Sequence, residues 1–212
     1  MYAEPPRGDV GGSFFMIRAS VLIDGGFLRA QAQQARLRYT PAFIQGFAER
    51  CVTADERLLR VLYYDCPPFV GTARLPISGE QRQFSGSDAW LKDLGRRDLF
   101  ALRLGALKFR GFKPRRQVIM HEPTDADFKP DFEQKGVDMR IGLDIANHAA
   151  QRSAERIVLV SGDTDCIPAM KHARINGLQV VVVSLPNHAL AAELLEHADF
   201  NRPVPWPDAD AA

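Results

Sequence analysis

The sequence of 212 residues is poor in cysteine and has no long apolar run. Its three cysteines, Cys51, Cys66 and Cys166, are widely separated and show neither metal-ligand spacing nor a disulfide framework. This pattern favours a reducing compartment, so we expect a cytoplasmic protein. No apolar stretch reaches the length of a membrane helix, and residues 1–12 contain acids and prolines where a secretory signal has an apolar core. We therefore expect no membrane partner.

Net charge is also nearly absent, and several functional motifs are missing. A net charge of +1 provides no overall basic field, so nucleic-acid binding requires a local basic patch. No P-loop and no Gly-x-Gly-x-x-Gly motif occurs. No Gly-x-Ser-x-Gly elbow surrounds Ser161, which favours a turn or capping residue over a nucleophile. The histidines show no zinc-ligand spacing; they are His121, His148, His172, His188 and His197.

Strand patterns alternate with helical patterns along the chain. Strands are expected at 19–23, 58–64, 99–107, 157–160 and 178–183. Helices are expected at 27–37, 40–51, 87–94, 137–150, 165–177 and 190–195. This alternation is typical of a two-sided α/β fold, and we predict a central, mainly parallel sheet of about five strands with helices on both faces.

The length suits one domain with a sizeable core. We expect a single domain over residues 16–202, a disordered tail at 1–15 and an irregular tail at 203–212. The stretch 69–86 lacks regular apolar patterning and is interpreted as a loop or a short insertion, and the acid- and proline-bearing stretch 121–133 is interpreted as a loop.

Acidic residues stand at the ends of predicted elements. Asp163 and Asp165 follow the buried strand 157–160, Asp24 follows the first strand, and Asp138 begins the helix at 137–150. Ligands of open α/β sheets bind outside the carboxyl ends of the strands. Two carboxylates about 4 Å apart repel each other by roughly 4 kcal/mol at an effective dielectric constant near 20. A hard divalent metal ion between these acids is the simplest compensation.

Each acid also has a structural alternative. An aspartate at a helix N-terminus is often only a cap, and Asp165 is the strongest case because it precedes the helix that contains Pro168. Asp144 has Arg140 four residues before it and His148 four residues after it, so a surface ion cluster explains it as well as a site does.

Three motifs carry a resemblance to a known family: DGGFLR (24–29), KGVDMRIGLDIA (135–146) and SGDTDCIP (161–168). Over about residues 17–200 the chain resembles the NYN domain family of the PIN-like nuclease group, in particular its bacterial LabA-like branch. This resemblance implies a Rossmann-like PIN fold, an acidic pocket for Mg²⁺ or Mn²⁺, ribonuclease activity and a homodimer. Many relatives have an asparagine where this chain has Phe27, and an aromatic residue where it has Cys166.

The family's acidic positions fall on Asp24, Asp138, Asp163 and Asp165. Our hypothesis is that Asp24, Asp138 and Asp163 are direct or water-mediated ligands of Mg²⁺ or Mn²⁺, while Asp165 orients the attacking water. Oxygen ligands hold these ions and leave water in their coordination shell. A second tier of candidates comprises Asp144, Ser161 and Lys135; Lys135 is interpreted either as a phosphate contact or as a solvent-facing residue.

A basic segment at 107–117 is the candidate RNA-binding surface. It contains no acid and carries Lys108, Arg110, Lys113, Arg115 and Arg116. Phe109 and Phe112 alternate with these cations, a composition suited to single-stranded RNA through phosphate pairing and base stacking. The alternative is a solvated strand end whose phenylalanines lie in a core.

The residues alone indicate phosphoester chemistry with a metal ion, and the resemblance implies RNA as the substrate. The predicted function is therefore metal-dependent hydrolysis of RNA phosphodiester bonds. A HAD-like phosphatase is a second interpretation, although DGGFL lacks the second acid that such an enzyme uses as general acid. A regulator that binds RNA or a nucleotide without turnover is a third, and Phe27 keeps it open.

Overall fold

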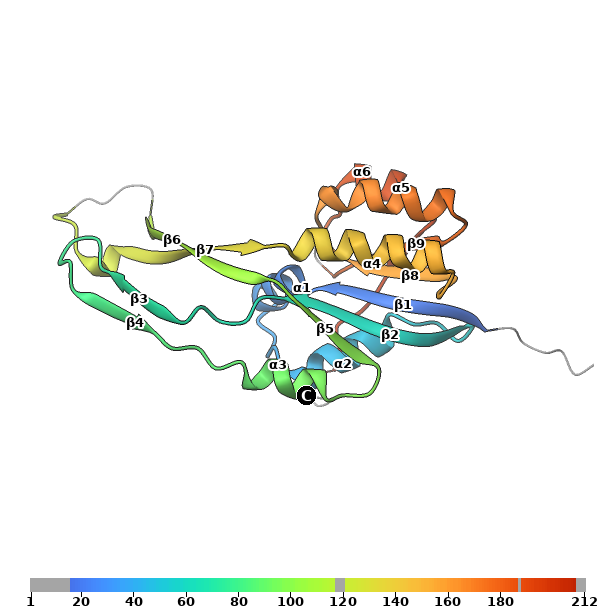
Figure 1. Ribbon diagram of the computed structural model, residues 1–212, viewed down its shortest axis with the longest axis horizontal. Coiled ribbons are helices and arrows are strands. Elements are labelled where there is room, and N and C mark those ends of the chain that lie inside the picture. The colour runs from blue at the N-terminus through green and yellow to red at the C-terminus, as the bar shows by residue number, and fades with distance from the viewer. Residues whose placement is uncertain (1–15, 117–120, 187, 209–212) are drawn as a thin grey trace, which may run out of the picture.

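The computed structural model describes residues 16–116, 121–186 and 188–208. A six-stranded parallel sheet in the order β10-β9-β8-β1-β2-β5 forms its centre (Figure 1). The strands of the sheet are β1 (Ile17–Asp24), β2 (Glu56–Asp65), β5 (Phe100–Leu104), β8 (Arg156–Val160), β9 (Gln179–Ser184) and β10 (Phe200–Pro203). The predicted α/β class is confirmed, with six parallel strands where about five were expected.

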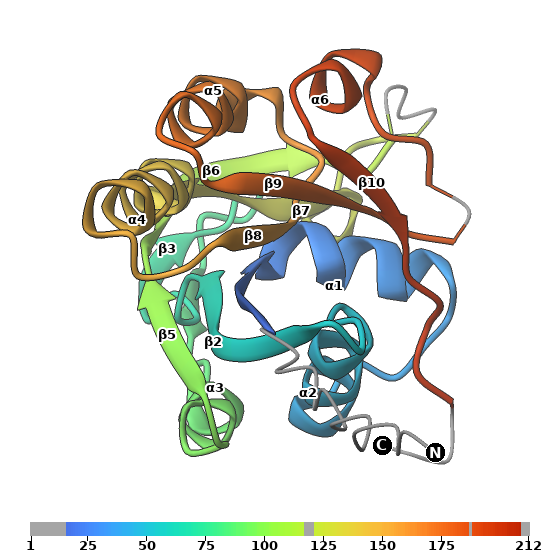
Figure 2. The same cartoon turned by 90° about the vertical axis from the view of Figure 1, so that its right-hand side faces the viewer.

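Helices cover both faces of the sheet (Figure 2). They are α1 (Gly25–Gln34), α2 (Pro41–Arg50), α3 (Ala89–Gly95), α4 (Val137–Gln151), α5 (Ile167–Ile175) and α6 (Ala192–Glu196). Alternate residues of β1 point to opposite faces. Val21 and Ile23 pack with α1, α2 and α3, whereas Leu22 packs with α4, α5 and α6.

Local sequence explains why α2 begins where predicted. Thr40 caps the helix by accepting a hydrogen bond from the backbone N of Phe43 at 3.1 Å, and Pro41 occupies the first position. A proline at this position costs no hydrogen bond, because the first N–H groups of a helix have no partner within the helix.

Two expectations about the elements were wrong. The stretch 99–107 is not one strand but the end of β5 and the start of β6 (Ala106–Pro114). The expected loop at 121–133 runs into β7 (Phe128–Lys135). The stretch 69–86, expected as a loop or a short insertion, contains the hairpin of β3 (Gly71–Arg74) and β4 (Gln81–Phe84). Strands of four residues, or strands that alternate charges with single phenylalanines, leave too little apolar periodicity to recognise.

The C-terminal tail was expected to be irregular from residue 203. Pro203 is the last residue of β10, and Val204 is buried in the core. Trp206 packs against Phe43 and Phe47 with ring centroids 6.0 and 5.8 Å apart. The tail has no regular structure from 204 to 208 but is packed on the domain, since an aromatic side chain can join a core without any helix or strand. The predicted disordered tail at 1–15 lies outside the described residues, and the single-domain boundaries stay a prediction.

The two hairpins, β3–β4 and β6–β7, lie together away from the α/β sheet (Figure 1), and we call them the hairpin arm. Their own small core consists of phenylalanines whose ring centroids lie 5.3 to 6.4 Å apart. These are Phe69, Phe84, Phe109, Phe112 and Phe132. Phe109 and Phe112 therefore pack within the arm. This agrees with the alternative interpretation of the basic segment, in which its phenylalanines lie in a core.

Strand order determines where a ligand would bind. The chain passes from β1 to β2 on one side, while β8 pairs with β1 on the other, with Ile23 opposite Val160. The residues after β1 and β8 thus leave the sheet side by side at a topological switch point, where ligands of open α/β sheets bind.

Candidate active site

Asp24 is the last residue of β1 and the N-cap of α1. Its Oδ1 accepts a hydrogen bond from the backbone N of Phe27 at 3.1 Å, which leaves Oδ2 for another partner. Burial raises the pKa of Asp24 to about 6; hydrogen bonds from the backbone of Phe27 and Gly26 act against this rise, and the charge of Asp138 adds to it. Asp24 can therefore cap α1 with one carboxylate oxygen and still offer the other oxygen to a ligand.

The turn after β8 is built around Ser161 and Asp163. Ser161 is fully buried, and its Oγ accepts a hydrogen bond from the backbone N of Asp163 at 3.1 Å. Asp163 Oδ1 in turn accepts one from the backbone N of Asp165 at 2.9 Å. Asp163, not Asp165, is thus the capping residue here, and α5 begins after Cys166 without a side-chain cap. Ser161 serves the turn, as its sequence context indicated.

Asp138 lies in the first turn of α4, two residues after Gly136, whose φ of 78° is a conformation that glycine adopts readily. Burial raises the pKa of Asp138, and the charges of Asp163 and Asp165 raise it further. The charge of Asp138 also raises the pKa of Asp24. Asp138 is therefore electrostatically coupled to each of the other three predicted acids. Like charges in such proximity favour a cation between them.

An open hollow of about 440 Å³ lies between Asp24 and Asp163. The other residues that line it are Gly26, Phe27, Gln31, Gln134, Gly162 and His188. The glutamines and His188 were not among the predicted site residues. No sequence signal marks them, because they come from three separate segments and lack the strand-end position that identified the acids.

The donor set at this hollow suits a hard divalent cation. Within the described residues no three His, Cys, Asp or Glu side chains converge on one point. Mg²⁺ commonly keeps several waters and binds through one or two carboxylates, so a fully closed protein shell is not required. Burial raises the pKa values of Asp24 and Asp138, and neighbouring carboxylates raise both further: Asp138 acts on Asp24, and Asp163 and Asp165 act on Asp138. The residues present fit the implied metal, with water completing its shell.

Asp144 is placed differently from the other acids. Its Oδ2 accepts hydrogen bonds from Tyr64 Oη at 2.8 Å and from Arg103 Nε at 2.9 Å. The expected ion cluster along α4 is not formed, because Arg140 donates to the carbonyl of Gly136 at 2.7 Å and His148 pairs with Ser153 Oγ at 2.7 Å. Asp144 is thus held between α4 and the sheet and does not line the hollow.

Acids of β7 face the basic segment, which the sequence motif alone did not indicate. Arg110 forms an ion pair with Glu133 at 2.5 Å, Lys113 pairs with Asp131, and Lys135 also pairs with Glu133. Lys108 lies opposite Glu133 in the strand register. Arg115 Nε donates to the carbonyl of Ala126 at 3.1 Å. Arg115 and Arg116 stand at the far end of β6; like Lys108, neither forms a salt bridge within the described residues, although the charge of Arg116 helps to lower the pKa of Asp127.

A fifth acid at the strand ends, Asp65, was not singled out from the sequence. It ends β2 beside Asp24, is 1% exposed, and forms an ion pair with Arg29. Tyr63 Oη donates to Asp65 at 3.0 Å and contacts Tyr39 Oη at 2.9 Å. Its position after a strand was a usable signal, but Arg29 neutralises it, so Asp65 supports the site without adding a free ligand.

This support makes Gly25 sensitive to substitution. A Cβ at Gly25 would lie 2.4 Å from Tyr63 Oη and 2.8 Å from the carbonyl oxygen of Tyr64. We expect Gly25→Ala to lower the free energy of unfolding by about 1–3 kcal/mol, as overpacking commonly does. Urea unfolding followed by circular dichroism measures this change.

Gly46→Ala is the matched control for that experiment. Gly46 is also a helix residue, but its Cβ would meet Pro207 at 3.7 Å, an ordinary contact. The control is expected to gain up to about 1 kcal/mol from helix propensity. Equal effects at both glycines would contradict the proposed close approach at Gly25.

The fold and the site define a class: a parallel α/β protein with acidic residues beside its topological switch point. Residues 99–202 match the model of the NYN domain, which defines a family of PIN-like nucleases. The matched range includes Asp138, Asp163 and Asp165, whereas Asp24 precedes it.

The chain is also similar to the crystal structure of a protein of unknown function from Vibrio parahaemolyticus. The two share 17% sequence identity with a TM-score of 0.49, over 89% of this chain and 93% of the other. The comparison with curated proteins found no match. In the described residues, no helix combines the length and apolar character that crossing a membrane requires.

Proposed function

We propose that this protein is a metal-dependent ribonuclease that hydrolyses phosphodiester bonds of single-stranded RNA. The observation that carries the proposal is the shared field of Asp24, Asp138 and Asp163 at the switch point of an NYN-type sheet. Carboxylates gathered without a countercharge beside an open hollow are the arrangement expected of a site for Mg²⁺ or Mn²⁺ and a phosphate.

Each acid has a part in this proposal. Asp24, Asp138 and Asp163 would hold the ion, directly or through water, and Asp165 is exposed beside them to orient the attacking water. A bound divalent ion supplies a more acidic water and stabilises negative charge on the phosphate. Asp24 and Asp163 are fixed for this task by their cap hydrogen bonds to Phe27 and Asp165.

The direct test is incubation of the purified protein with labelled RNA, labelled DNA and a generic phosphomonoester. Each substrate is presented with Mn²⁺, with Mg²⁺ and with a chelator. We expect RNA cleavage in the presence of either metal ion and none with the chelator. Hydrolysis of the phosphomonoester alone would instead support a HAD-like phosphatase.

One observation favours a second candidate, a regulator that binds RNA without cleaving it. The ring of Phe27 lies in the hollow between the two acids and packs on Gly162, whose Cβ would be 2.6 Å from the ring. No polar side chain stands at this position to bind a water or a phosphate oxygen. RNA binding without cleavage under every metal condition would support the regulator.

The hairpin arm provides a prediction about binding. Charge reversal at Arg115 and Arg116 to Glu is expected to weaken RNA affinity several-fold and to reduce the salt slope of binding by about 1 for each phosphate that is no longer neutralised. Fluorescence anisotropy over a range of salt concentrations measures both quantities. Lys171→Glu, a charge reversal at an exposed residue of α5, is the control. An unchanged slope in the double variant would favour a merely solvated strand end.

A further inference from the structure

The hollow beside Asp24 and Asp163 has an aromatic side. Phe27 and His188 line it with their ring centroids 5.1 Å apart and an interplanar angle of 71°. Phe27 rests directly on the backbone of Gly162, in the turn that carries Asp163. Two rings from distant segments are therefore held next to the carboxylates.

The hollow also has two amide groups. Gln31 from α1 and Gln134 from β7 line it. A Cβ at Gly26 would lie 3.0 Å from Oε1 and 3.1 Å from Nε2 of Gln134, so this amide lies over the turn that follows Asp24. An amide both donates and accepts hydrogen bonds. A planar group with donors and acceptors on its edge suits such a lining.

Charge indicates which part of an RNA fits here. The lining residues include two aspartates and no lysine or arginine. A phosphate would be repelled by this lining unless a cation lay between, whereas an uncharged base would not be. The volume of about 440 Å³ lies in the range of small-ligand sites.

We propose that the hollow is a subsite for one unpaired nucleobase of the substrate, adjacent to the phosphate that is cleaved. This inference rests on the function proposed above and adds the substrate class. Phe27 and His188 contact the base through their rings, while Gln31 and Gln134 bind its edge. Base-aromatic contacts are tolerant of sequence, and amides add a preference among bases. A base paired in a duplex is not free to enter, so the subsite selects single-stranded RNA.

The test uses RNA oligonucleotides in which one abasic position is moved along the strand. Binding is measured by fluorescence anisotropy with Ca²⁺ in place of Mg²⁺, so that the RNA stays intact. For the wild-type protein we expect one position at which loss of the base weakens binding about tenfold. Phe27→Leu keeps the apolar contact with Gly162 and removes the aromatic ring, so it should bind intact and abasic RNA equally well at that position.

Two controls keep the result interpretable. Phe200→Leu removes a half-exposed aromatic ring at the opposite end of the sheet and should retain the abasic penalty. Thermal unfolding confirms that each variant is folded. A penalty of equal size in Phe27→Leu and the wild type, the absence of any sensitive position, or the absence of single-stranded RNA binding would overturn the inference.

The same experiment separates this inference from the proposed function. Cleavage of RNA without an abasic penalty would support the proposed ribonuclease activity and contradict the proposed base subsite. An abasic penalty without cleavage under any metal condition would support the base subsite and contradict the ribonuclease activity. The protein would then bind RNA without turnover.

Discussion

Replacement of Asp163 by Asn is expected to reduce metal-dependent RNA cleavage by about 10²- to 10³-fold while leaving the fold intact. Asparagine has nearly the same shape as aspartate and retains an oxygen that accepts the hydrogen bond from the backbone N of Asp165. What it removes is a negative charge that helps to bind the divalent ion. The cleavage rate at saturating Mn²⁺ and the melting temperature are the two measurements.

The same substitution should change the neighbouring acid. The charge of Asp163 raises the pKa of Asp138, so in Asp163→Asn without metal this pKa should move down toward its ordinary value. NMR titration of the side-chain carboxyl carbon reports it. Asp93→Asn, on the exposed side of α3 where Asp93 pairs with Arg97, is the matched control and should cleave RNA at the wild-type rate. A wild-type rate in Asp163→Asn would remove this carboxylate from the mechanism.

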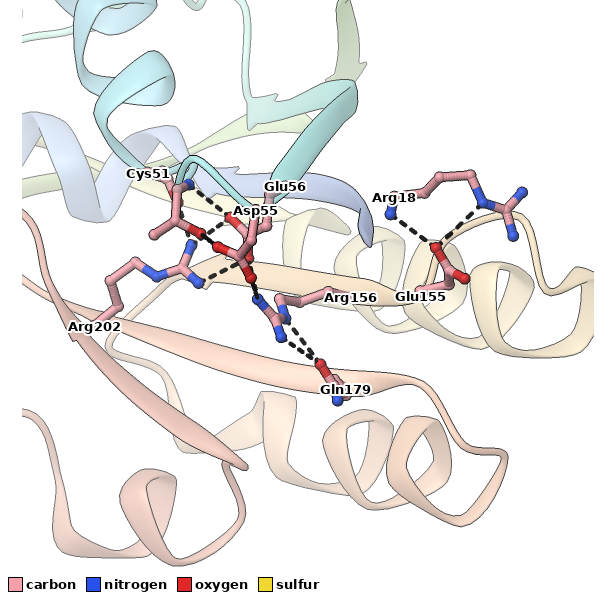
Figure 3. A network of polar contacts seen from close by, with 9 residues as sticks. Arg18, Cys51, Asp55, Glu56, Glu155, Arg156, Gln179 and Arg202 are labelled. Carbon is pink, nitrogen blue, oxygen red and sulfur yellow. Dashed lines mark hydrogen bonds and ion pairs between the residues drawn. The ribbon is translucent and has the colours of Figure 1, made fainter. Parts of the chain in front are cut away.

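Replacement of Glu56 by Gln is expected to lower the free energy of unfolding by about 3–5 kcal/mol, the cost of breaking a buried ion pair from one side. The Glu56 side chain is fully buried at the start of β2 (Figure 3). It accepts hydrogen bonds from Arg156 Nη1 at 2.6 Å and from Arg202 Nη2 at 2.8 Å. Glutamine leaves these two guanidinium groups facing each other without the negative charge between them.

This network also predicts how stability depends on pH. Burial acts to raise the pKa of Glu56, but the hydrogen bonds from Arg202 and Arg156 outweigh it and lower the pKa from 4.5 to about 2. A carboxyl whose pKa is lower in the folded state stabilises the fold above its unfolded pKa. This contribution is therefore complete above about pH 5 and is lost as the pH falls through 4.5 toward 2.

Urea unfolding at a series of pH values tests both statements. The wild type should lose stability in this acidic window, and Glu56→Gln should lose less because it has no group there to protonate. Glu155→Gln is the control: Glu155 pairs with Arg18 at 3.5 Å with both side chains about half exposed, and such surface pairs contribute little (Figure 3). Parallel pH curves for wild type and Glu56→Gln would contradict the assignment.

Much of the α/β framework was readable from local sequence. The buried strand at Arg156–Val160 and the helix at Val137–Gln151 were found with boundaries close to those observed, because each has a sustained apolar period. The start of α2 was found because Thr40 and Pro41 are a local signal. The hairpin arm was not found, since its short strands are stabilised by phenylalanines that come together only from separate segments of the chain.

The sequence by itself determined the candidate residues: residue type and position at the end of a strand or the start of a helix pointed to Asp24, Asp138, Asp163 and Asp165, and the motifs around them pointed to an NYN-type protein. Only the tertiary structure decided which neighbours these acids have. It placed Asp144 with Tyr64 and Arg103, away from the hollow, and set acids of β7 against the basic segment. It also brought Phe27 and His188 together beside Asp163. The physical reason is that strand ends and caps are encoded within a few residues, whereas the partner of a side chain depends on strand order and register across the whole chain.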